Sequence, residues 1–264
     1  MHWIIIIIKS LSICRYKNSI SSVSLFFLLN SHGLGSTYWN EVIKILKNII
    51  PVYDKVNSAI SLGKDNQYRK EGIVNSVFSG NKVLDAGSGY GNMSKLVLEN
   101  VSKDVMIHFY DPIPEMLNGI SGNFRGYDVE FYLCSGIFEK IPFKSESFDA
   151  VICGYSIRDS IDLEKAFEEI HRVLKDNGRF LIVDLGKPDN LVLRMLVTIY
   201  LKYFLVIVAF LTAGKQGLPF RTLYGTYLRW PKNNDLEKLL SKRFSRVDFR
   251  KKLLGGAIIV IAYK

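Results

Sequence analysis

The stretch VLDAGSGYGNMSKLV, residues 83–97, joins an apolar segment to an amphipathic one through three glycines at alternate positions. We expect a short buried strand at 82–86 and a helix directly after the loop. Gly87, Gly89 and Gly91 can adopt positive φ and have no Cβ that would hold a ligand away. The free N–H groups at the start of the helix favour electron-rich or anionic groups. The stretch therefore predicts a nucleotide-type binding loop.

A second apolar strand, expected at 105–110, ends in Asp111. An acid in this place can accept hydrogen bonds from ribose hydroxyls, or it can cap the turn before Pro112. Two cofactor classes fit the loop and the acid: a dinucleotide and S-adenosylmethionine. The dinucleotide fingerprint is spaced G-x-G-x-x-G. Here the spacing is G-x-G-x-G, introduced by Asp85, which favours S-adenosylmethionine.

With this loop, the sequence LDAGSGYG resembles the class I S-adenosylmethionine-dependent methyltransferases. Strand and helix patterns alternate from residue 82 to residue 184, which indicates right-handed crossovers and a parallel sheet covered on both faces. The last segment, GAIIVIAYK, is the expected hairpin partner of 247–253. The resemblance implies a Rossmann-like α/β fold. Its sheet has seven strands and is mostly parallel, with a C-terminal antiparallel hairpin and a helical insertion after the fifth strand.

Residues 1–37 differ in composition from the rest: they contain no acid, many serines and two short apolar runs at 4–8 and 23–29. Each run is too short to span a bilayer, and the pattern of a signal peptide is not clear. We assign this leader no role in the fold; it is either disordered or the product of a start codon placed too far upstream. A single methyltransferase domain is expected at 38–264, with 191–232 as a helical lid insertion.

The positive charge is concentrated near the C-terminus. The net charge is +10, and residues 215–252 hold eleven Lys or Arg against three acids. A solvated basic tail, a nucleic-acid surface and contact with an anionic membrane all have this pattern. Neither an N-P-P-aromatic motif nor a catalytic cysteine pair is present, so we expect no nucleic-acid partner. Cysteines and histidines lack ligand spacing, so we expect no metal.

Three further stretches are similar to the quinone-biosynthesis C-methyltransferases, which methylate the ring of demethylmenaquinol or of a polyprenyl-benzoquinol. VYDKVNSAISLG followed by YR matches their first signature, and GYSIRDSIDLEKAFEEIHRVLKDNGRFLIVDLGKP matches their second. The segments YLKYFL and GTYLRWPKNNDLEKLL have the family's tyrosine spacing before an aromatic-Pro step. The resemblance covers roughly 40–264 and implies S-adenosylmethionine as cofactor and a lipid-tailed quinol as substrate.

The resemblance also assigns the cofactor site. The residues implied are Asp85, Gly87, Gly89, Tyr90, Gly91, Asp111, Pro112, Met116, Ile137, Phe138 and Gly154. Ile137 and Phe138 stand where an Asp or Asn and an Ala usually meet the adenine. Because Ile137 cannot accept from the adenine amine, we expect weaker or differently satisfied adenine binding rather than its loss.

The candidate catalytic residues are Arg158, which matches the family arginine, and Asp159, which replaces the usual asparagine. The sulfonium is already activated, so the site must align the reacting atoms and raise the electron density of the ring. Arg158 can stabilise a phenolate or order the water that takes its proton. Alternatively, it pairs with Asp159 or Asp162 in a structural role. The substrate side is expected to include Tyr53, Asn57 and Tyr200.

Two other functions fit the same fold: a phospholipid or other small-molecule N-methyltransferase, and a non-catalytic protein that binds S-adenosylmethionine. The departures at Ile137 and Asp159 leave the second open.

The segment 191–213 is strongly apolar and is interrupted only by Arg194 and Lys202. It can be core packing, a membrane span, or a lid-like helix pair that shields the quinol and presents an apolar face to the membrane. We expect the lid, because charges inside a span are costly and a span here would pull the sheet apart. The enzyme is then expected in the cytoplasm, attached peripherally to the inner face of the membrane.

Overall fold

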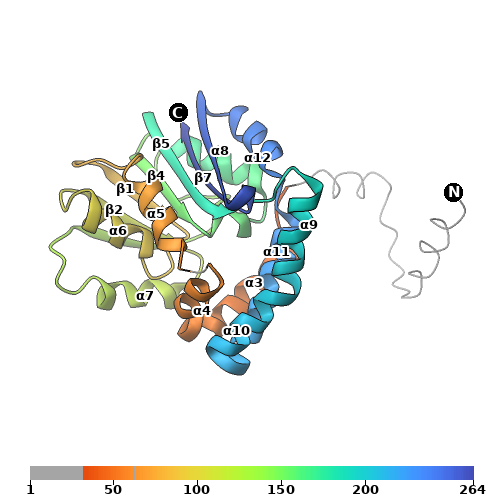
Figure 1. Cartoon of the computed structure of the whole chain (residues 1–264). Coiled ribbons are helices and arrows are strands. Elements are labelled where there is room, and N and C mark those ends of the chain that lie inside the picture. The colour runs from red at the N-terminus through yellow and green to blue at the C-terminus, as the bar shows by residue number, and fades with distance from the viewer. Residues whose placement is uncertain (1–31, 62) are drawn as a thin grey trace, which may run out of the picture. The chain divides into compact units, whose positions relative to one another are not determined.

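The computed structural model describes residues 32–61 and 63–264, which form a seven-stranded sheet with helices on both faces (Figure 1). The strand order is β3-β2-β1-β4-β5-β7-β6. The strands are β1 Lys82–Ala86, β2 Met106–Asp111, β3 Phe131–Ser135, β4 Phe148–Gly154, β5 Leu174–Leu185, β6 Arg246–Lys252 and β7 Ala257–Tyr263. Strands β1 to β5 pair in parallel, and β7 pairs antiparallel with β5 and β6. The predicted fold class is confirmed.

The described helices fall into three groups. Their bounds are α3 Ser36–Ile49, α4 Tyr53–Ile60, α5 Asp65–Ile73, α6 Asn92–Asn100, α7 Pro114–Asn123, α8 Leu163–Val173, α9 Leu191–Ile199, α10 Leu205–Ala213, α11 Thr222–Arg229 and α12 Asn233–Ser241. Helices α5, α6 and α7 pack on one face of the sheet, and α8 and α12 on the other. Strand side chains alternate between these two cores, so both faces of the sheet are buried.

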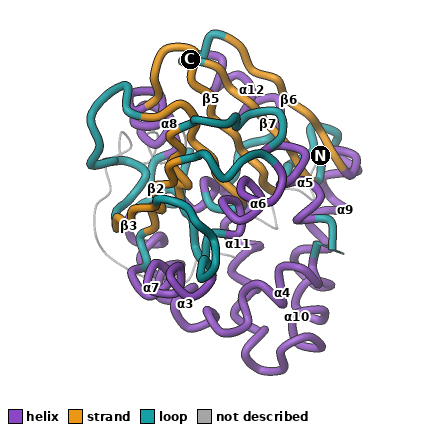
Figure 2. Tube along the Cα trace, turned by 90° about the vertical axis from the view of Figure 1, so that its left-hand side faces the viewer, coloured by secondary structure: helices purple, strands orange, loops and turns teal. Residues whose placement is uncertain are grey.

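The third group is a helical cluster formed by α3, α4, α10 and the segment that returns from α10 (Figures 1 and 2). Leu201, Leu205 and Ala209 on one face of the apolar segment are buried against Ile49 and Val56. Helices α3 and α4 precede the first strand in the sequence, whereas α10 and the return segment follow the fifth strand, β5. Their packing creates a second, smaller core beside the strands, and this core carries much of the site described below.

Some boundaries differ from those expected. Residues 32–37, which were placed in the leader, pack on the rest of the described chain: the N–H of Leu34 donates to Ser160 O (2.9 Å), and Leu34 is buried. The rest of the expected leader, 1–31, lies outside the described residues. Helix α8 ends at Val173, and Asn177 lies within β5 with a positive φ of 61°.

The apolar segment continues from α9 through one turn of π-helix, Tyr200–Phe204, into α10. The stretch Leu191–Arg229 is apolar and long enough to cross a membrane, but one such helix is weak evidence for a span. The chain reverses after Gly214, and the return segment packs so closely that a Cβ on Gly217 would lie 2.0 Å from Ala209 O. The segment is therefore a helix with a packed return.

Candidate active site

The glycine loop connects β1 to α6 at the carboxyl end of the strand. Gly91 precedes α6 in the left-handed conformation (φ 85°), and Gly87 also has positive φ (70°). A Cβ on Gly87 would lie 2.3 Å from Ser156 Oγ. The loop can therefore pass this close to the end of β4 only because Gly87 has no side chain.

Asp85 connects the strand before the loop to the helix after it. Its Oδ2 accepts from the N–H and the Oγ of Ser94, at 3.2 and 2.6 Å, and so joins β1 to α6. The carboxyl group is 1% exposed, and burial raises its pKa to about 7 against the opposing effect of the Ser94 hydrogen bonds. Asp85 does not line the pocket above the loop, so its position is that of a residue that shapes the loop.

Asp111 lies at the end of β2, across the loop. Its Oδ2 accepts from Gly89 N (2.9 Å) and its Oδ1 from Ile113 N (2.8 Å). Each carboxylate oxygen has a second lone pair, which a ribose hydroxyl can use. Burial raises the pKa of Asp111 to about 6, although both backbone N–H groups act in the opposite direction.

A pocket of about 810 Å³ lies above the loop. It brings together nine of the eleven predicted cofactor residues: Gly87, Gly89, Tyr90, Asp111, Pro112, Met116, Ile137, Phe138 and Gly154. Gly91 and Asp85 do not line it. Ser88 Oγ is buried in this pocket and has no hydrogen-bond partner among the described residues. A glycine loop without side chains, an acid at the end of β2 and a hydroxyl group that is free to form a hydrogen bond suit S-adenosylmethionine.

The sequence did not indicate that α3 covers this pocket. Trp39, Ile43 and Leu46 line it from that helix. Two polar contacts join the helices around the pocket: Lys47 Nζ on α3 donates to Glu115 Oε1 on α7 (3.1 Å), and Asn92 on α6 donates to Asp54 Oδ1 on α4 (2.8 Å). Only the amphipathic pattern of α3 was visible in the sequence, and that pattern does not say what a helix covers.

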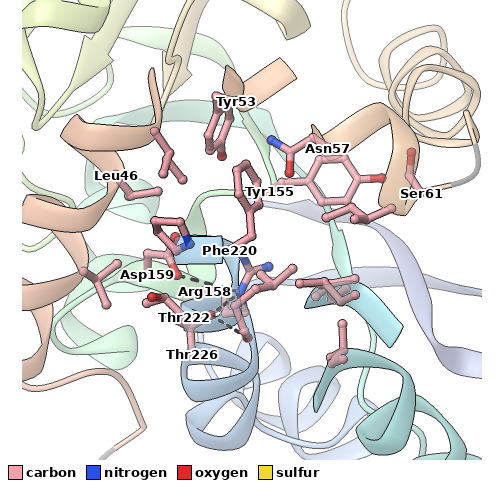
Figure 3. Close-up of a pocket in the computed structure, with 18 of the residues that line it drawn as sticks. Leu46, Tyr53, Asn57, Ser61, Tyr155, Arg158, Asp159, Phe220, Thr222 and Thr226 are labelled. Carbon is pink, nitrogen blue, oxygen red and sulfur yellow. Dashed lines mark hydrogen bonds and ion pairs between the residues drawn. The ribbon is translucent and has the colours of Figure 1, made fainter. Parts of the chain in front are cut away.

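A second pocket, of about 820 Å³, adjoins the first and is mainly apolar. Its walls come from α3, α4, the apolar segment and the return segment (Figure 3). The three predicted substrate-side residues and both predicted catalytic residues line it: Tyr53, Asn57, Tyr200, Arg158 and Asp159. Tyr200 Oη donates to Ile60 O (2.7 Å), which ties the apolar segment to α4.

Five residues line both pockets and form the junction between them: Leu46, Tyr53, Arg69, Tyr155 and Asp159. Arg69 pairs with Asp65 (2.8 Å) and its guanidinium lies 4.9 Å from the centre of the Tyr155 ring. Tyr155 has a left-handed backbone (φ 62°), a strained conformation for a bulky residue. A molecule in the apolar pocket would meet a molecule in the pocket above the loop at this junction.

Arg158 is locked in place by its neighbours. Its Nη1 donates to Asp184 Oδ1 and its Nε donates to Thr226 Oγ1 (3.0 Å). The Arg158 side chain is 4% exposed and that of Asp184 is 0% exposed. Of the structural partners considered from the sequence, Asp159 lies 3.7 Å away, whereas Asp162 caps α8 by accepting from Lys165 N. The principal partner, Asp184, was not foreseen.

Asp159 stands beside Arg158 in the pocket wall (Figure 3). Its Oδ1 is buried without a hydrogen-bond partner among the described residues, and Arg158 Nε lies 3.7 Å from it. Burial raises the pKa of Asp159, while Arg158 and the Thr226 hydroxyl act to lower it. The geometry supplies a fixed cation and an unsatisfied carboxylate to the same pocket.

Comparisons with known proteins agree with this geometry. A demethylmenaquinone methyltransferase of Bacteroides fragilis is 28% identical over 238 residues, covering 85% of this chain and 92% of that protein. A 2-phytyl-1,4-naphtoquinone methyltransferase of Nostoc punctiforme is 29% identical over 173 residues, covering 64% and 75%.

Among solved structures, a SAM-dependent methyltransferase from Aquifex aeolicus superposes with a TM-score of 0.53 at 15% identity, covering 80% of this chain and 97% of that one. This likeness concerns the fold alone. The model of the ubiE/COQ5 methyltransferase family matches residues 33–264. The chain therefore belongs to the ubiE/COQ5 methyltransferase family and is a methyltransferase whose cofactor is S-adenosylmethionine.

Proposed function

We propose that the enzyme methylates a ring carbon of a polyprenylated quinol, of the demethylmenaquinol or the benzoquinol type, in quinone biosynthesis. The observation that carries the proposal is the apolar pocket that meets the cofactor pocket at a polar junction. The names of the relatives from Bacteroides fragilis and Nostoc punctiforme, both of which refer to naphthoquinones, support the naphthoquinol type.

The pocket matches the two parts of such a substrate. Ile45, Ile60, Leu201, Leu205 and Leu223 are among its apolar lining residues and suit an aromatic ring and the first units of a prenyl tail. Its polar side chains gather at Asn57, Arg158 and Asp159, where ring hydroxyls need partners. A small, charged amine substrate of an N-methyltransferase would have no use for the apolar wall.

Bound S-adenosylmethionine supplies a methyl group that is already activated by its sulfonium. The residues of the chain then have three tasks. The glycine loop and Asp111 fix the cofactor, the apolar walls hold the ring and exclude water, and Arg158 provides a fixed positive charge where a ring oxygen becomes negative.

The test uses the purified full chain, S-adenosylmethionine and a short-tailed 2-prenyl-1,4-naphthoquinone kept reduced with dithionite. We expect a quinone product heavier by one methylene unit, with no product when the quinone stays oxidised or when phosphoethanolamine replaces it. Methylation of phosphoethanolamine alone would favour the N-methyltransferase. Binding of S-adenosylmethionine in calorimetry without turnover of either substrate would favour the non-catalytic protein.

We also propose that the enzyme works in the cytoplasm, docked on the inner face of the membrane that holds its substrate. The helix from Leu191 to Ala213 exposes an apolar stripe: Leu191, Val192, Met195, Leu196, Ile199, Tyr203, Phe204, Ile207, Phe210 and Leu211. Residues 191–232 contain six Lys or Arg and no acid. Apolar side chains flanked by basic ones suit anionic headgroups over acyl chains.

The turn between β6 and β7 extends the stripe. Leu253 and Leu254 are 59% and 77% exposed, and both have positive φ (47° and 55°). A Cβ on the neighbouring Gly256 would lie 3.3 Å from Val197 of α9, so this turn is beside the helix. Two strained leucines held out to solvent support contact with an apolar phase.

A further inference from the structure

The junction of the two pockets contains one carboxylate among the residues that the structure describes, that of Asp159. Other acids near the pockets are already engaged. Asp65 pairs with Arg69 at 2.8 Å, and Asp54 accepts from Asn92 at 2.8 Å. Asp111 binds two backbone N–H groups at the far side of the glycine loop. Among the acids of the described residues, Asp159 is the one that lines both pockets.

Arg158 cannot take up a proton, because a guanidinium stays protonated in proteins. Its contacts with Asp184 and Thr226 also keep it from turning toward the ring. It does place its charge 3.7 Å from Asp159 Oδ1, too far for a hydrogen bond to satisfy that oxygen. Two carboxylates, Asp159 and Asp184, thus share one buried cation. Of the two, Asp159 lines the apolar pocket, whereas Asp184 lies outside it, and Oδ1 of Asp159 is buried without a hydrogen-bond partner among the described residues.

We infer that Asp159 is the general base of the reaction, whose carboxylate takes the proton of the quinol hydroxyl. The inference rests on the proposed function, because it requires an ionisable hydroxyl at the junction. In the step, the hydroxyl O–H bond breaks, its electron pair stays on the ring oxygen, and a new O–H bond forms on Asp159. The ring thereby becomes a stronger carbon nucleophile, Arg158 stabilises its oxygen, and Asp159 later releases the proton to water.

The surroundings of Asp159 suit this role. Its charge interacts with Arg158 on its own turn, Tyr38 on α3, Tyr53 on α4 and Asp184 on β5, and the Thr226 hydroxyl on α11 hydrogen-bonds it. Arg69 on α5 lines both pockets with it and is paired with Asp65. Burial raises the pKa of Asp159, which makes the carboxylate a better proton acceptor than an exposed one. Because a base must be ionised to act, turnover should rise with pH through the pKa of Asp159.

The experiment compares wild-type enzyme with Asp159→Asn, using the reduced 2-prenyl-1,4-naphthoquinone from pH 5 to pH 10. We expect kcat to fall about 10²- to 10⁴-fold, the range of general-base catalysis, with the S-adenosylmethionine Kd within twofold. The rate of the variant should climb toward pH ~10, where a phenolic hydroxyl ionises unaided, whereas the wild-type rate stays flat there. Asp176→Asn, at an exposed carboxylate far from both pockets, is the matched control and should keep the wild-type profile.

A second variant keeps the test decisive if Asp159→Asn fails to fold. Asp159→Ala should regain activity with added formate but not with chloride, because formate returns a carboxylate to the vacated space.

The inference is overturned if Asp159→Asn keeps kcat within threefold of wild type. It is equally overturned if its loss is not reversed at high pH while cofactor affinity and Tm fall together, since that pattern marks a structural residue. Wild-type enzyme that methylates no quinol would overturn the proposed function and the base with it. If the wild-type enzyme and Asp159→Asn are equally active, only the assignment of Asp159 as the general base is overturned.

Discussion

Asp111 and Gly89 are joined across the glycine loop by a hydrogen bond of 2.9 Å from the Gly89 N–H to Asp111 Oδ2. The two interpretations of this acid from the sequence, ribose acceptor and turn cap, are therefore not exclusive. Oδ1 accepts from Ile113 N at the turn that follows β2. A residue that holds the loop in shape is also in position to hold what the loop binds.

Asp111→Ala is expected to raise the S-adenosylmethionine Kd by one to two orders of magnitude. The change removes a charge-assisted acceptor, worth roughly 1.5–3 kcal/mol, and frees the loop. Calorimetric titration measures the effect, with Asp128→Ala at an exposed position as control. An unchanged Kd together with a lowered Tm would restrict Asp111 to turn capping.

The pair formed by Arg158 and Asp184 predicts an asymmetry in stability. Arg158→Met leaves the fully buried Asp184 carboxylate without its cation, which costs about 3–5 kcal/mol for buried pairs. Arg158→Met combined with Asp184→Asn should recover part of this loss, because the buried charge is gone. Urea unfolding of the single and double variants at pH 7 decides. A single variant within about 1 kcal/mol of wild type would show that the ion pair is not needed, since one kcal/mol is within the usual effect of a mutation.

The raised pKa of Asp85, about 7, predicts how stability depends on pH. Between its ordinary pKa and about 7, the folded protein holds a proton on Asp85 that the unfolded chain has lost. The contribution of Asp85 to the free energy of unfolding is therefore complete at acidic pH and is lost as the pH rises through about 7.

Asp85→Asn, which cannot ionise, should give a shallower fall in the free energy of unfolding between pH 6 and pH 7.5 than wild type. Urea melts without cofactor at closely spaced pH values measure both slopes. Parallel slopes would mean that Asp85 is ionised in the folded protein throughout this range.

Much of the sheet and of the candidate cofactor site could be predicted from the sequence, because the signals are local. The glycine spacing, the acid after β2 and the apolar strands each occupy a few consecutive residues. Ile137 and Phe138 were assigned by resemblance, and both line the cofactor pocket in the structure.

Contacts between distant segments could not be predicted in the same way. Arg158 follows β4 and Asp184 ends β5, so their pairing requires knowing that these strands are neighbours. Trp39 and Leu46 line the pocket above the glycine loop because α3 packs over it. The amphipathic pattern of α3 does not indicate where the helix packs. The apolar segment had a clear composition, yet only the packed structure distinguishes its buried face at Leu201 and Leu205 from its exposed stripe.

The exposed stripe predicts binding to anionic membranes. The full chain should sediment with vesicles that contain phosphatidylglycerol, and high salt should release it, because lysine and arginine contacts with headgroups are screened. Leu196→Glu with Ile207→Glu should weaken binding more than tenfold, since each buried leucine or isoleucine contributes roughly 1.5–3 kcal/mol. Leu133→Glu, at an exposed apolar position on β3, is the matched control and should bind like wild type.

The outcomes of the vesicle experiment distinguish three cases: a helix docked on the membrane surface, a helix that spans the membrane, and a helix whose apolar stripe is covered by another surface. A spanning helix would stay in the membrane through a carbonate wash until detergent is added. It would also have to take Leu201, Leu205 and Tyr200 out of the apolar pocket that they line. Protein that stays in the supernatant beside anionic vesicles would mean that another surface covers the stripe. Release by salt or carbonate, together with loss of binding in the double variant, is the result that supports a helix lying in the plane of the membrane.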